Sequence, residues 1–533
     1  MYKRIQNGSD VRGIAITGVE GENVNLTPTT AFHIGCGFAE WLAKRLGKDA
    51  QDLRISVGRD PRLSGPLLSS AMVAGLASRG SKVVQYGLAT TPAMYMSCIL
   101  EGHLNDGAIM ITASHLPFNR NGFKFFTREG GLEKKDITEL LQQAAASAAS
   151  QMGEGGQQSY SDAAHVLQTA LQVDPESVPE ESFMPVYSEH MRKLLKEGIN
   201  HPEHFDTPLD GLHFLVDAGN GGGGFFATDV LAPLGADITG SQFLDPDGMF
   251  PNHIPNPEDK GAMASATDAV KRHKPDLGIV FDTDVDRSAV VASSGEPINS
   301  NRYIALMAAV TLRKYPGTTI VTDSVTSNGL TKFIKGLGGK HFRYKRGYKN
   351  VISKGIELNE KGEETNLMME TSGHGAMKEN YFLDDGAYSA LQIIVETAKQ
   401  QVDGGKSITE DLLGKLPEPL EAAEFRLKLQ TENFKDEGAR ILGAFRGWVE
   451  EGASGASGWT MEADNHEGWR VSVDEGEGKQ GWLLLRASLH DPLLVLNVES
   501  DVTGGMRGII DKVVDFFAIS DFKADSSQLK DFQ

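Results

Sequence analysis

Three aspartates, Asp282, Asp284 and Asp286, alternate along the short segment FDTDVDRS, and Arg287 follows them directly. Carboxylates at this density repel one another unless a cation lies among them, and hard oxygen ligands suit Mg²⁺. An EF-hand calcium loop is disfavoured, because the glycine and the distal glutamate of such a loop do not follow at the right offsets. The segment therefore predicts a magnesium site with the three aspartates as ligands. A solvated acidic turn is the alternative.

A serine lies directly after the apolar run GAIMI, in the segment TASHLPFNRNGFKFF. A strand that ends at a small hydroxyl residue can leave that hydroxyl at the mouth of a cleft. Alone, Ser114 would be only a turn residue, but His115 and Lys124 lie close to it in sequence. A serine near a divalent ion and a lysine suits phosphoryl transfer, in which charge on the moving group must be neutralised. A serine hydrolase is disfavoured because the G-x-S-x-G segment is missing.

A third polar segment, METSGHGAM, places Glu370, Ser372 and His374 around a glycine turn. Short polar side chains on such a turn can bind sugar hydroxyls through paired hydrogen bonds. A turn with a helix cap gives the same pattern and remains the alternative.

Several residues are candidates for binding an anion. They are Arg12 in GSDVRG, Arg59 and Arg62 in GRDPRLSG, Lys349 in RGYKN, and Arg486 with Ser488 in RASLHDP. A guanidinium and a hydroxyl together can hold a phosphate. An exposed lysine and an exposed arginine at a strand end are the alternatives. The run GNGGGG lacks the lysine of a phosphate loop and predicts tight packing between a strand and a helix instead.

Strand-like and helix-like runs alternate along most of the chain, as in RISVGRD, GPLLSSAMVAGLASRG and GAIMITASH. This rhythm predicts α/β units. The stretch from about 144 to 180 is small, polar and acidic, and it predicts a linker or an inserted surface segment. From about 415 the pattern alternates more and predicts a smaller α+β domain with an antiparallel sheet. The expected domains are 1–180, 181–297, 298–414 and 415–533.

Composition excludes several classes of protein. A chain of 533 residues is too long for one hydrophobic core. Its net charge of −20 argues against non-specific binding to nucleic acid. Apolar runs fall short of transmembrane length, so we expect no membrane partner. Two cysteines, Cys36 and Cys98, without metal-type spacing favour a reducing compartment. We expect the cytoplasm, or a plastid stroma if a transit peptide has been removed.

Taken together, these segments resemble the α-D-phosphohexomutase superfamily of phosphoglucomutases and phosphomannomutases. TASHLPFNRNGFK is similar to its phosphoserine loop, DTDVDR to its metal loop and ETSGH to its sugar-recognition loop. GSDVRG, PDGMFPNHIPNPE and the DDG at 384–386 are further similar segments, in the same order. The resemblance covers nearly the whole chain. It implies a four-domain architecture, with three similar α/β domains and a smaller C-terminal α+β domain around a central cleft.

The resemblance also implies roles for single residues. Ser114 would carry a phosphoryl group that passes to a hexose phosphate, giving a hexose 1,6-bisphosphate that also serves as activator. Mg²⁺ would be held by the three aspartates and a phosphoserine oxygen. The implied roles of the remaining residues are transfer of the phosphoryl group (Lys124, Arg287), proton transfer (Lys349, His115), sugar binding (Glu370, Ser372, His374) and phosphate binding (Arg12, Arg486, Ser488).

The C-terminal loop departs from the family pattern Arg-x-Ser-Gly-Thr-Glu-Pro. Arg486 and Ser488 match it, but Leu489 and His490 stand in place of the glycine and the threonine. The expected activity is interconversion of hexose 1-phosphate and hexose 6-phosphate, with glucose favoured over mannose. The alternatives are a hexose 1,6-bisphosphate synthase and a catalytically weak regulatory relative that binds sugar phosphates. A monomer or a homodimer is expected.

Overall fold

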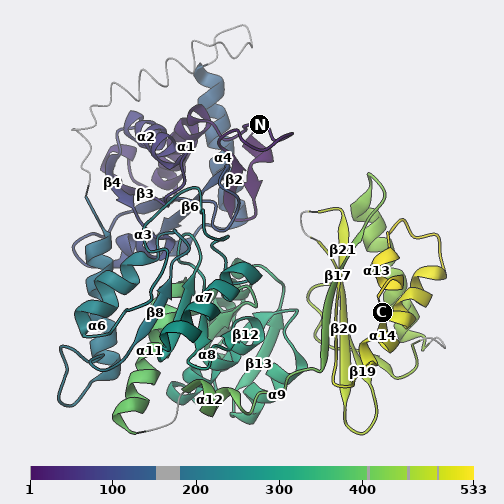
Figure 1. Ribbon diagram of the computed structural model, residues 1–533. Helices are drawn as coiled ribbons and strands as arrows, with labels where there is room; N and C mark the ends of the chain where they lie inside the picture. Colours follow the sequence, from purple (N-terminus) through teal and green to yellow (C-terminus); the bar gives the residue numbers. More distant parts are fainter. Residues whose placement is uncertain (1, 152–180, 405–407, 453–455, 489–490, 533) are drawn as a thin grey trace. The chain divides into compact units, whose positions relative to one another are not determined.

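The computed structural model describes residues 2–151, 181–404, 408–452, 456–488 and 491–532 (Figure 1). The chain forms two compact units. The first comprises Met1–Tyr303 and Ser372–Glu410, and the second comprises Ile304–Thr371 and Asp411–Gln533. Among the described helices, none combines the length and the apolar character needed to cross a membrane.

The N-terminal part of the first unit is a mixed sheet with the strand order β1-β2-β6-β5-β3-β4, and β7 pairs with β6. Its strands are β1 (Gln6–Asn7), β2 (Asp10–Ile14), β3 (Arg54–Arg59), β4 (Lys82–Leu88), β5 (Gly107–Ile111), β6 (Arg120–Thr127) and β7 (Gly130–Gly131). Helices α2 (Gly65–Ser78) and α4 (Lys134–Gln151) both pack on α1 (Pro28–Leu46) in the core, and α3 (Thr91–Ile99) packs on β5 and β6. The predicted strands and helix of this region are confirmed.

The predicted linker from about 144 is wrong for its first residues, because α4 continues to Gln151. The alanines of this stretch have high helix propensity, and their small size lets α4 approach α1 closely. Ala144 is fully buried, and a Cβ on Gly37 would lie 2.7 Å from its backbone nitrogen. The stretch whose composition resembles a linker is thus the end of a helix that packs closely on α1. Residues 152–180 of the predicted linker lie outside the described residues.

A second sheet of the first unit has the order β11-β10-β9-β8, with β8 parallel to β9 and β10 antiparallel to it. The strands are β8 (Phe214–Asp217), β9 (Leu277–Phe281), β10 (Ser288–Ala292) and β11 (Pro297–Ile298). The helices of this part are α6 (Met184–Ile199), α7 (Lys260–His273) and α11 (Gly386–Val402), and a short pair, β15 (Gly375–Met377) with β16 (Leu383–Asp384), precedes α11.

The glycine run after β8 packs tightly, as predicted. A Cβ on Gly221 would lie 2.7 Å from the Thr283 carbonyl oxygen, and one on Gly224 would lie 2.3 Å from the Leu244 carbonyl oxygen. The following turns, Phe226–Leu231 and Ala232–Leu234, are π- and 3₁₀-helical. The run therefore brings backbone against the loop that carries Thr283, which is the acidic segment.

The second unit contains a parallel group of strands and a separate antiparallel sheet. The parallel group consists of β12 (Thr319–Asp323), β13 (Lys340–Tyr344) and β14 (Thr365–Met369), with helices α9 (Asn328–Gly336) and α10 (Tyr348–Glu360). Helices α8 (Ser300–Lys314) and α12 (Ile408–Leu413) lie where the chain passes between the units.

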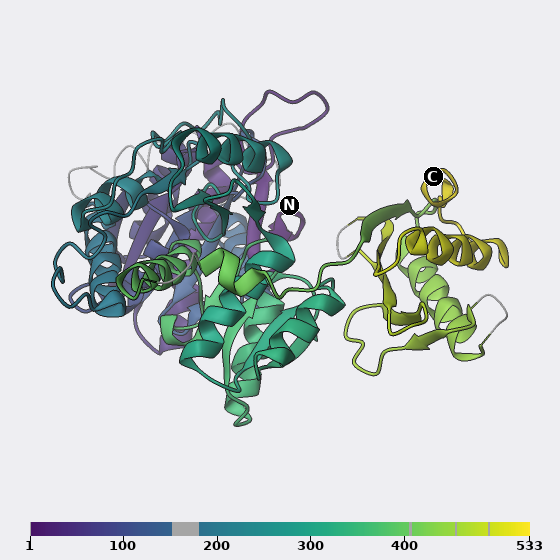
Figure 2. The same ribbon diagram turned by 60° about the horizontal axis from the view of Figure 1, so that its bottom comes forward.

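The antiparallel sheet confirms the predicted C-terminal α+β domain. Its strands follow the order β17-β21-β20-β19-β18. They are β17 (Glu421–Lys428), β18 (Trp459–Met461), β19 (Trp469–Asp474), β20 (Gln480–Ala487) and β21 (Leu493–Ser500). Helices α13 (Phe434–Glu450) and α14 (Gly505–Ala518) cover one face of the sheet (Figure 2), and α15 (Ser527–Lys530) packs near β17. On the other side of the sheet, Arg470 of β19 donates to the Ser324 carbonyl oxygen in the loop after β12 at 3.0 Å, and Glu467, just before β19, accepts from the Arg346 amide in the loop after β13 at 3.0 Å.

Candidate active site

Ser114 lies in the loop between β5 and β6 and has a left-handed backbone, with φ of 52°. Such a conformation costs about 1 kcal/mol or more for a residue with a Cβ, so the surroundings must impose it. The Ser114 amide donates to Thr112 Oγ1 at 2.8 Å. The side chain is buried, and Ser114 Oγ donates to Asp282 Oδ2 at 3.1 Å. The loop therefore presents the serine hydroxyl to the acidic segment, as the sequence predicted.

A buried arginine, Arg62, holds this loop in shape from inside the protein. Its Nη1 donates to the carbonyl oxygens of Pro117 at 2.7 Å and Arg120 at 3.1 Å. Its Nη2 donates to the carbonyl oxygens of Leu116, at 2.6 Å, and Ser114. Its Nε pairs with Asp60 at 3.1 Å. All five guanidinium donors are thus used, four of them on the backbone of the Ser114 loop.

The three aspartates follow β9 and are fully buried. One ligand atom of each lies within 4.8 Å of one from each of the others. Thr91 Oγ1 donates to Asp284 Oδ2 at 2.5 Å, and Lys124 Nζ donates to Asp286 Oδ2. The other carboxylate oxygen of Asp284 and that of Asp286 are buried without a hydrogen-bond partner among the described residues. Buried carboxylate oxygens without partners are what a bound cation satisfies, so this donor set fits Mg²⁺.

Burial and the surrounding charges shift the pKa values of two of these aspartates in opposite directions. Burial, with Asp286 next to it, raises the pKa of Asp282 well above the ordinary value, although Arg287 opposes the rise. Burial also acts on Asp286, but Lys124 and His374 outweigh it and hold the pKa of that carboxyl far below the ordinary value. The site thus holds three close carboxylates among the cations Lys124, Arg287 and His374.

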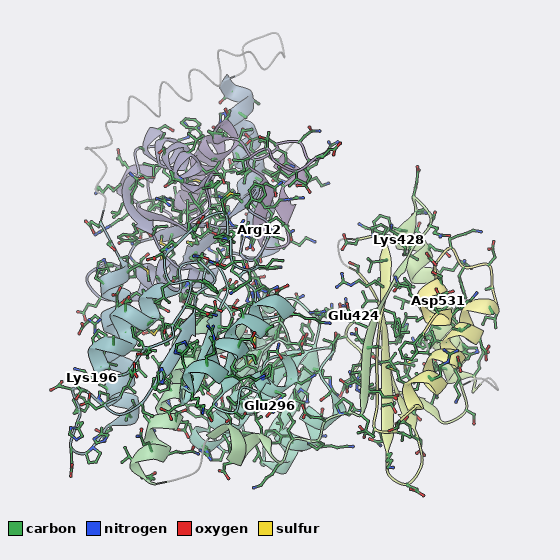
Figure 3. All side chains as sticks on the ribbon, in the orientation of Figure 1. Arg12, Lys196, Glu296, Glu424, Lys428 and Asp531 are labelled. Carbon is green, nitrogen blue, oxygen red and sulfur yellow. The ribbon has the colours of Figure 1, made fainter. Side chains whose placement is uncertain are left out.

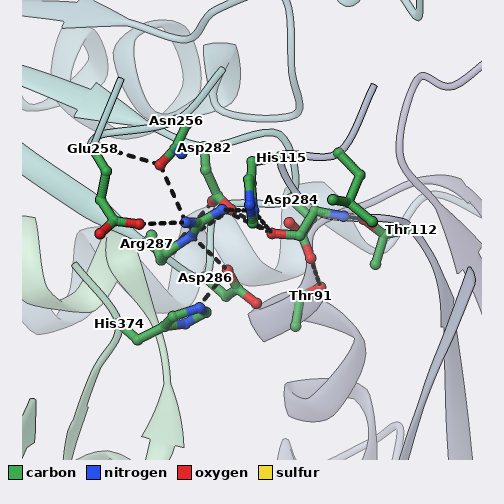
Figure 4. Close-up of polar contacts among 12 residues, drawn as sticks. Thr91, Thr112, His115, Asn256, Glu258, Asp282, Asp284, Asp286, Arg287 and His374 are labelled. Carbon is green, nitrogen blue, oxygen red and sulfur yellow. Dashed lines mark hydrogen bonds and ion pairs between the residues drawn. The ribbon is translucent and has the colours of Figure 1, made fainter. Parts of the chain in front are cut away.

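Arg287 joins the serine loop to the acidic segment (Figure 4). Its Nη2 donates to Ser114 Oγ at 2.9 Å and lies 2.6 Å from His115 Nδ1. Its Nε donates to Asp282 Oδ2 at 3.0 Å. Burial, together with the charges of Arg287 and Arg12, lowers the pKa of His115 to about 2. His115 is therefore a neutral imidazole that accepts a hydrogen bond from Arg287.

Lys124 and Arg12 reach the site from the strands next to the serine loop. Lys124 is on β6, opposite Met110 of β5, and its Nζ lies 3.6 Å from Asp284 Oδ2. Arg12 is on β2 (Figure 3), where its Nη1 donates to the Thr112 carbonyl oxygen at 2.8 Å and its Nη2 pairs with Asp10 at 2.8 Å. Both cations thus flank the loop that carries Ser114.

His374 lies among carboxylates. Its Nδ1 is 2.5 Å from Asp384 Oδ2 and 3.8 Å from Asp286 Oδ1. Burial alone would lower the pKa of His374, but Asp384 and Asp286 raise it to about 9. The histidine is therefore a cation at neutral pH and shields Asp286.

The remaining predicted residues divide between the two units. Ser372 belongs to the first unit, where the carbonyl oxygen of the following residue, Gly373, accepts from the Ser288 amide at 3.4 Å. Glu370, Lys349, Arg486 and Ser488 belong to the second unit. Glu370 Oε1 accepts from the amide of Gly347 at 2.6 Å, at the start of α10, whose first turn carries Lys349. Leu489 and His490, at which the sequence departs from the family pattern, lie outside the described residues.

Sequence reasoning gave no role to several residues that complete the first-unit cluster. Arg287 Nη1 donates to Asn256 Oδ1 at 3.2 Å and lies 3.8 Å from Glu258 Oε2. Thr91, which donates to Asp284, is another such residue. Asn256 and Glu258 lie in the PNPE stretch, whose similarity to the family was the one sign in the sequence that these residues belong to the site.

Comparison with known proteins assigns most of the chain. Residues 3–152, 187–295 and 299–415 match the models of phosphoglucomutase/phosphomannomutase α/β/α domains I, II and III. The chain is 29% identical over 504 residues to a phosphoglucomutase of Neisseria gonorrhoeae, covering 93% of each chain. It is 29% identical over 497 residues to a phosphomannomutase/phosphoglucomutase of Pseudomonas aeruginosa, covering 92% of this chain and 91% of the relative.

A solved structure agrees with these relatives. The crystal structure of a phosphoglucomutase/phosphomannomutase family protein from Burkholderia thailandensis has a TM-score of 0.72 and 26% identity, and the match covers 96% of each chain. Three consecutive domain models, relatives matched over more than nine-tenths of their length and one structural match all point to the same family. The chain belongs to the phosphoglucomutase/phosphomannomutase family and is an isomerase of the phosphohexomutase type.

Proposed function

We propose that the protein interconverts hexose 1-phosphate and hexose 6-phosphate through a phosphoserine at Ser114 and a hexose 1,6-bisphosphate intermediate. The observation that supports this most directly is the position of the serine hydroxyl, 3.1 Å from Asp282 and 2.9 Å from Arg287. The hydroxyl lies beside three buried carboxylates and a buried lysine. Positioned opposite charges of this kind stabilise a transferring phosphoryl group.

In the forward step, the free hydroxyl of the hexose phosphate attacks the phosphorus atom on Ser114. A new sugar O–P bond forms, and the bond between phosphorus and Ser114 Oγ breaks. Arg287 already contacts Ser114 Oγ and is suited to stabilise the leaving oxygen. Lys124, which is buried beside Asp284 and Asp286, neutralises the charge of the phosphoryl group. The reverse step on the other phosphate returns the phosphoryl group to Ser114 after the bisphosphate has turned over.

We assign Asp282, Asp284 and Asp286 as the residues that would hold Mg²⁺. One oxygen of Asp284 and one of Asp286 are buried without a hydrogen bond among the described residues, which supports this assignment. When bound, the ion would supply a positive charge for the oxygens of the phosphoryl group.

The proton of the attacking sugar hydroxyl needs a base, and we assign that role to Lys349. His115 suits it less, because its pKa of about 2 makes it a poor base and its Nδ1 lies against Arg287. We assign His115 to orienting Arg287. Glu370, Ser372 and His374 are proposed for the sugar, and Arg12, Arg486 and Ser488 for phosphate.

The proposal extends to substrate and compartment. Glucose phosphate is the favoured substrate and mannose phosphate the second. Both cysteines, Cys36 and Cys98, are buried free thiols, which supports a reducing compartment such as the cytoplasm.

Phosphorus NMR tests the function. The protein is incubated with Mg²⁺, glucose 1-phosphate and a trace of glucose 1,6-bisphosphate, beside Ser114→Ala as control. Growth of glucose 6-phosphate with the unmodified chain alone is expected. Accumulation of the bisphosphate with an equal amount of free glucose, left by a second glucose 1-phosphate that served as phosphoryl donor, would identify a bisphosphate synthase instead. Failure with glucose, mannose and glucosamine phosphates alike would favour a binding role.

A further inference from the structure

Arg486, the proposed phosphate-binding arginine of the C-terminal domain, lies near the end of β20 and is 7% exposed. Its Nη1 lies 3.6 Å from Glu467 Oε1, which is an ion pair without a close hydrogen bond. Its Nε is buried and has no hydrogen-bond partner among the described residues. A buried guanidinium with an unused donor retains the capacity to bind a further anion.

Glu467 is held beside this arginine by hydrogen bonds to its carboxylate and by the close packing of the residue that follows it. Its Oε2 accepts from Ser324 Oγ at 2.8 Å and from the Arg346 amide at 3.0 Å. The next residue, Gly468, has φ of 62°, and a Cβ there would lie 2.2 Å from the Leu485 carbonyl oxygen and 2.7 Å from Arg486 Cα. Only glycine allows this approach, so the turn backbone presses against the strand that carries Arg486. The carboxylate is thus held in place before any ligand arrives.

The neighbouring charges agree with this placement. Burial lowers the pKa of Arg486, and the charge of Arg346 lowers it further, whereas Glu467 and Glu424 raise it. Glu424 lies on β17, the edge strand of the same sheet (Figure 3). Arg346 has its own partner, because its Nε lies 3.5 Å from Asp323 Oδ2. Glu467 is therefore the carboxylate paired with Arg486 among the described residues.

We propose that Glu467 is an internal counter-anion that lowers the affinity of Arg486 for phosphate. A phosphate that binds Arg486 must displace this carboxylate or share the guanidinium with it, and either costs free energy. The inference rests on the proposed function, in which Arg486 holds the phosphate that is not reacting. A weakened grip serves a mutase, because the bisphosphate must leave this site and return with its ends exchanged, and tight binding would slow its release.

The test compares binding of inorganic phosphate to the full chain, measured by titration calorimetry, among Glu467→Gln, Arg486→Ala and the double variant. Glutamine can still accept from Ser324 and from the Arg346 amide but carries no charge. Glu467→Gln is expected to bind phosphate about threefold to tenfold more tightly, the range of a partly screened ion pair. The gain should vanish when Arg486 is also alanine, which separates this site from any phosphate bound near Ser114.

A matched control is Glu462→Gln. Glu462 lies in the same turn but pairs with Arg470 at 3.1 Å, so its substitution should leave phosphate affinity unchanged. In the enzyme assay, Glu467→Gln should lower KM for the hexose phosphate and should not raise kcat. If Glu467→Gln does not fold, Glu467→Asp retracts the charge by one methylene and should show a smaller gain.

Two results would overturn the inference: unchanged or weaker phosphate binding in Glu467→Gln, or a gain that persists without Arg486. Failure of the proposed function looks different. In that case the unmodified chain converts no hexose phosphate, while the phosphate titrations still show the Arg486-dependent gain.

Discussion

Arg287 donates one hydrogen bond to Ser114 Oγ at 2.9 Å and another to Asp282 Oδ2 at 3.0 Å. The planar guanidinium therefore connects the proposed nucleophile to the acidic segment. An ammonium group cannot reproduce both contacts in the same geometry. Arg287→Lys is expected to lower kcat by about a hundredfold or more, with a smaller change in KM. Steady-state kinetics with hexose 1-phosphate measures this, and Arg272→Lys on the exposed side of α7 is the control. A kcat within threefold of the original would remove Arg287 from the mechanism.

Mg²⁺ is expected to stabilise the folded chain through the three aspartates. A ligand that binds only the native state contributes about 2.7 kcal/mol at a hundred times its Kd. Thermal unfolding should therefore shift upward with Mg²⁺ relative to EDTA, and Asp284→Asn should abolish most of the shift. Without Mg²⁺, Asp284→Asn should be about as stable as the original, because the loss of the 3.6 Å ion pair with Lys124 is offset by relief of repulsion from Asp286. The exposed Asp206→Asn is the control, and an equal Mg²⁺ response in Asp284→Asn would contradict the assignment.

Arg62 is expected to be required for the shape of the Ser114 loop. Lysine at this position leaves several buried carbonyl oxygens without a donor, at a cost of about 2 to 4 kcal/mol in the free energy of unfolding. Because Ser114 would lose its imposed left-handed backbone, the phosphate carried per chain should also fall. Intact-protein mass after incubation with glucose 1,6-bisphosphate measures that load. Arg59→Lys is a nearby comparison, and a stable, fully phosphorylated Arg62→Lys would refute the role.

The stability of the second unit is expected to depend on pH through Glu499. Burial raises the pKa of this carboxyl to about 7 from an ordinary 4.5, and Trp482, Arg470 and Arg343 offset burial only in part. Between these two values the folded chain retains a proton that the unfolded chain has lost. Stability therefore falls as pH rises from 4.5 to 7, and the loss is complete above the folded pKa. Glu499→Gln, which stays neutral, should lack this decline.

Urea unfolding at pH 5 and pH 8, followed by tryptophan fluorescence, measures the difference. Four of the five tryptophans, Trp448, Trp459, Trp469 and Trp482, belong to the second unit, so the signal reports mainly on it. The exposed Glu450→Gln is the control for removal of a charge. An identical pH dependence in Glu499→Gln and the original chain would show that the carboxyl does not titrate in this window.

The sequence predicted the reactive residues better than it predicted the residues that hold them in place. Ser114 and Asp282 are 168 positions apart, yet both follow apolar strands, and the loops after those strands meet. A serine after one strand and three closely spaced aspartates after another are a combination that suits few reactions other than phosphoryl transfer, and this made the prediction possible. The sequence offered Arg62 only as a candidate for binding an anion, because a guanidinium that binds backbone carbonyls leaves no pattern in the sequence of the loop that it holds.

The other differences have similar physical causes. The alanine-rich end of α4 has a linker-like composition, and only its contact with Gly37 of α1 identifies it as packed helix. The sequence carries no sign that His374 pairs with a carboxylate, because whether a histidine lies beside a carboxylate depends on tertiary packing. Asp384, ten residues further along the chain, supplies that packing here.

The burial of Ser114 has a consequence for how this serine first becomes phosphorylated. Ser114 is 6% exposed, and its backbone is held in a tight left-handed turn. A protein kinase needs an accessible, extended peptide segment, which this loop does not offer. On the proposed mechanism, the priming phosphate must therefore arrive on a small sugar bisphosphate. The fraction of chains that carry it after purification would then record how much bisphosphate the cell contained.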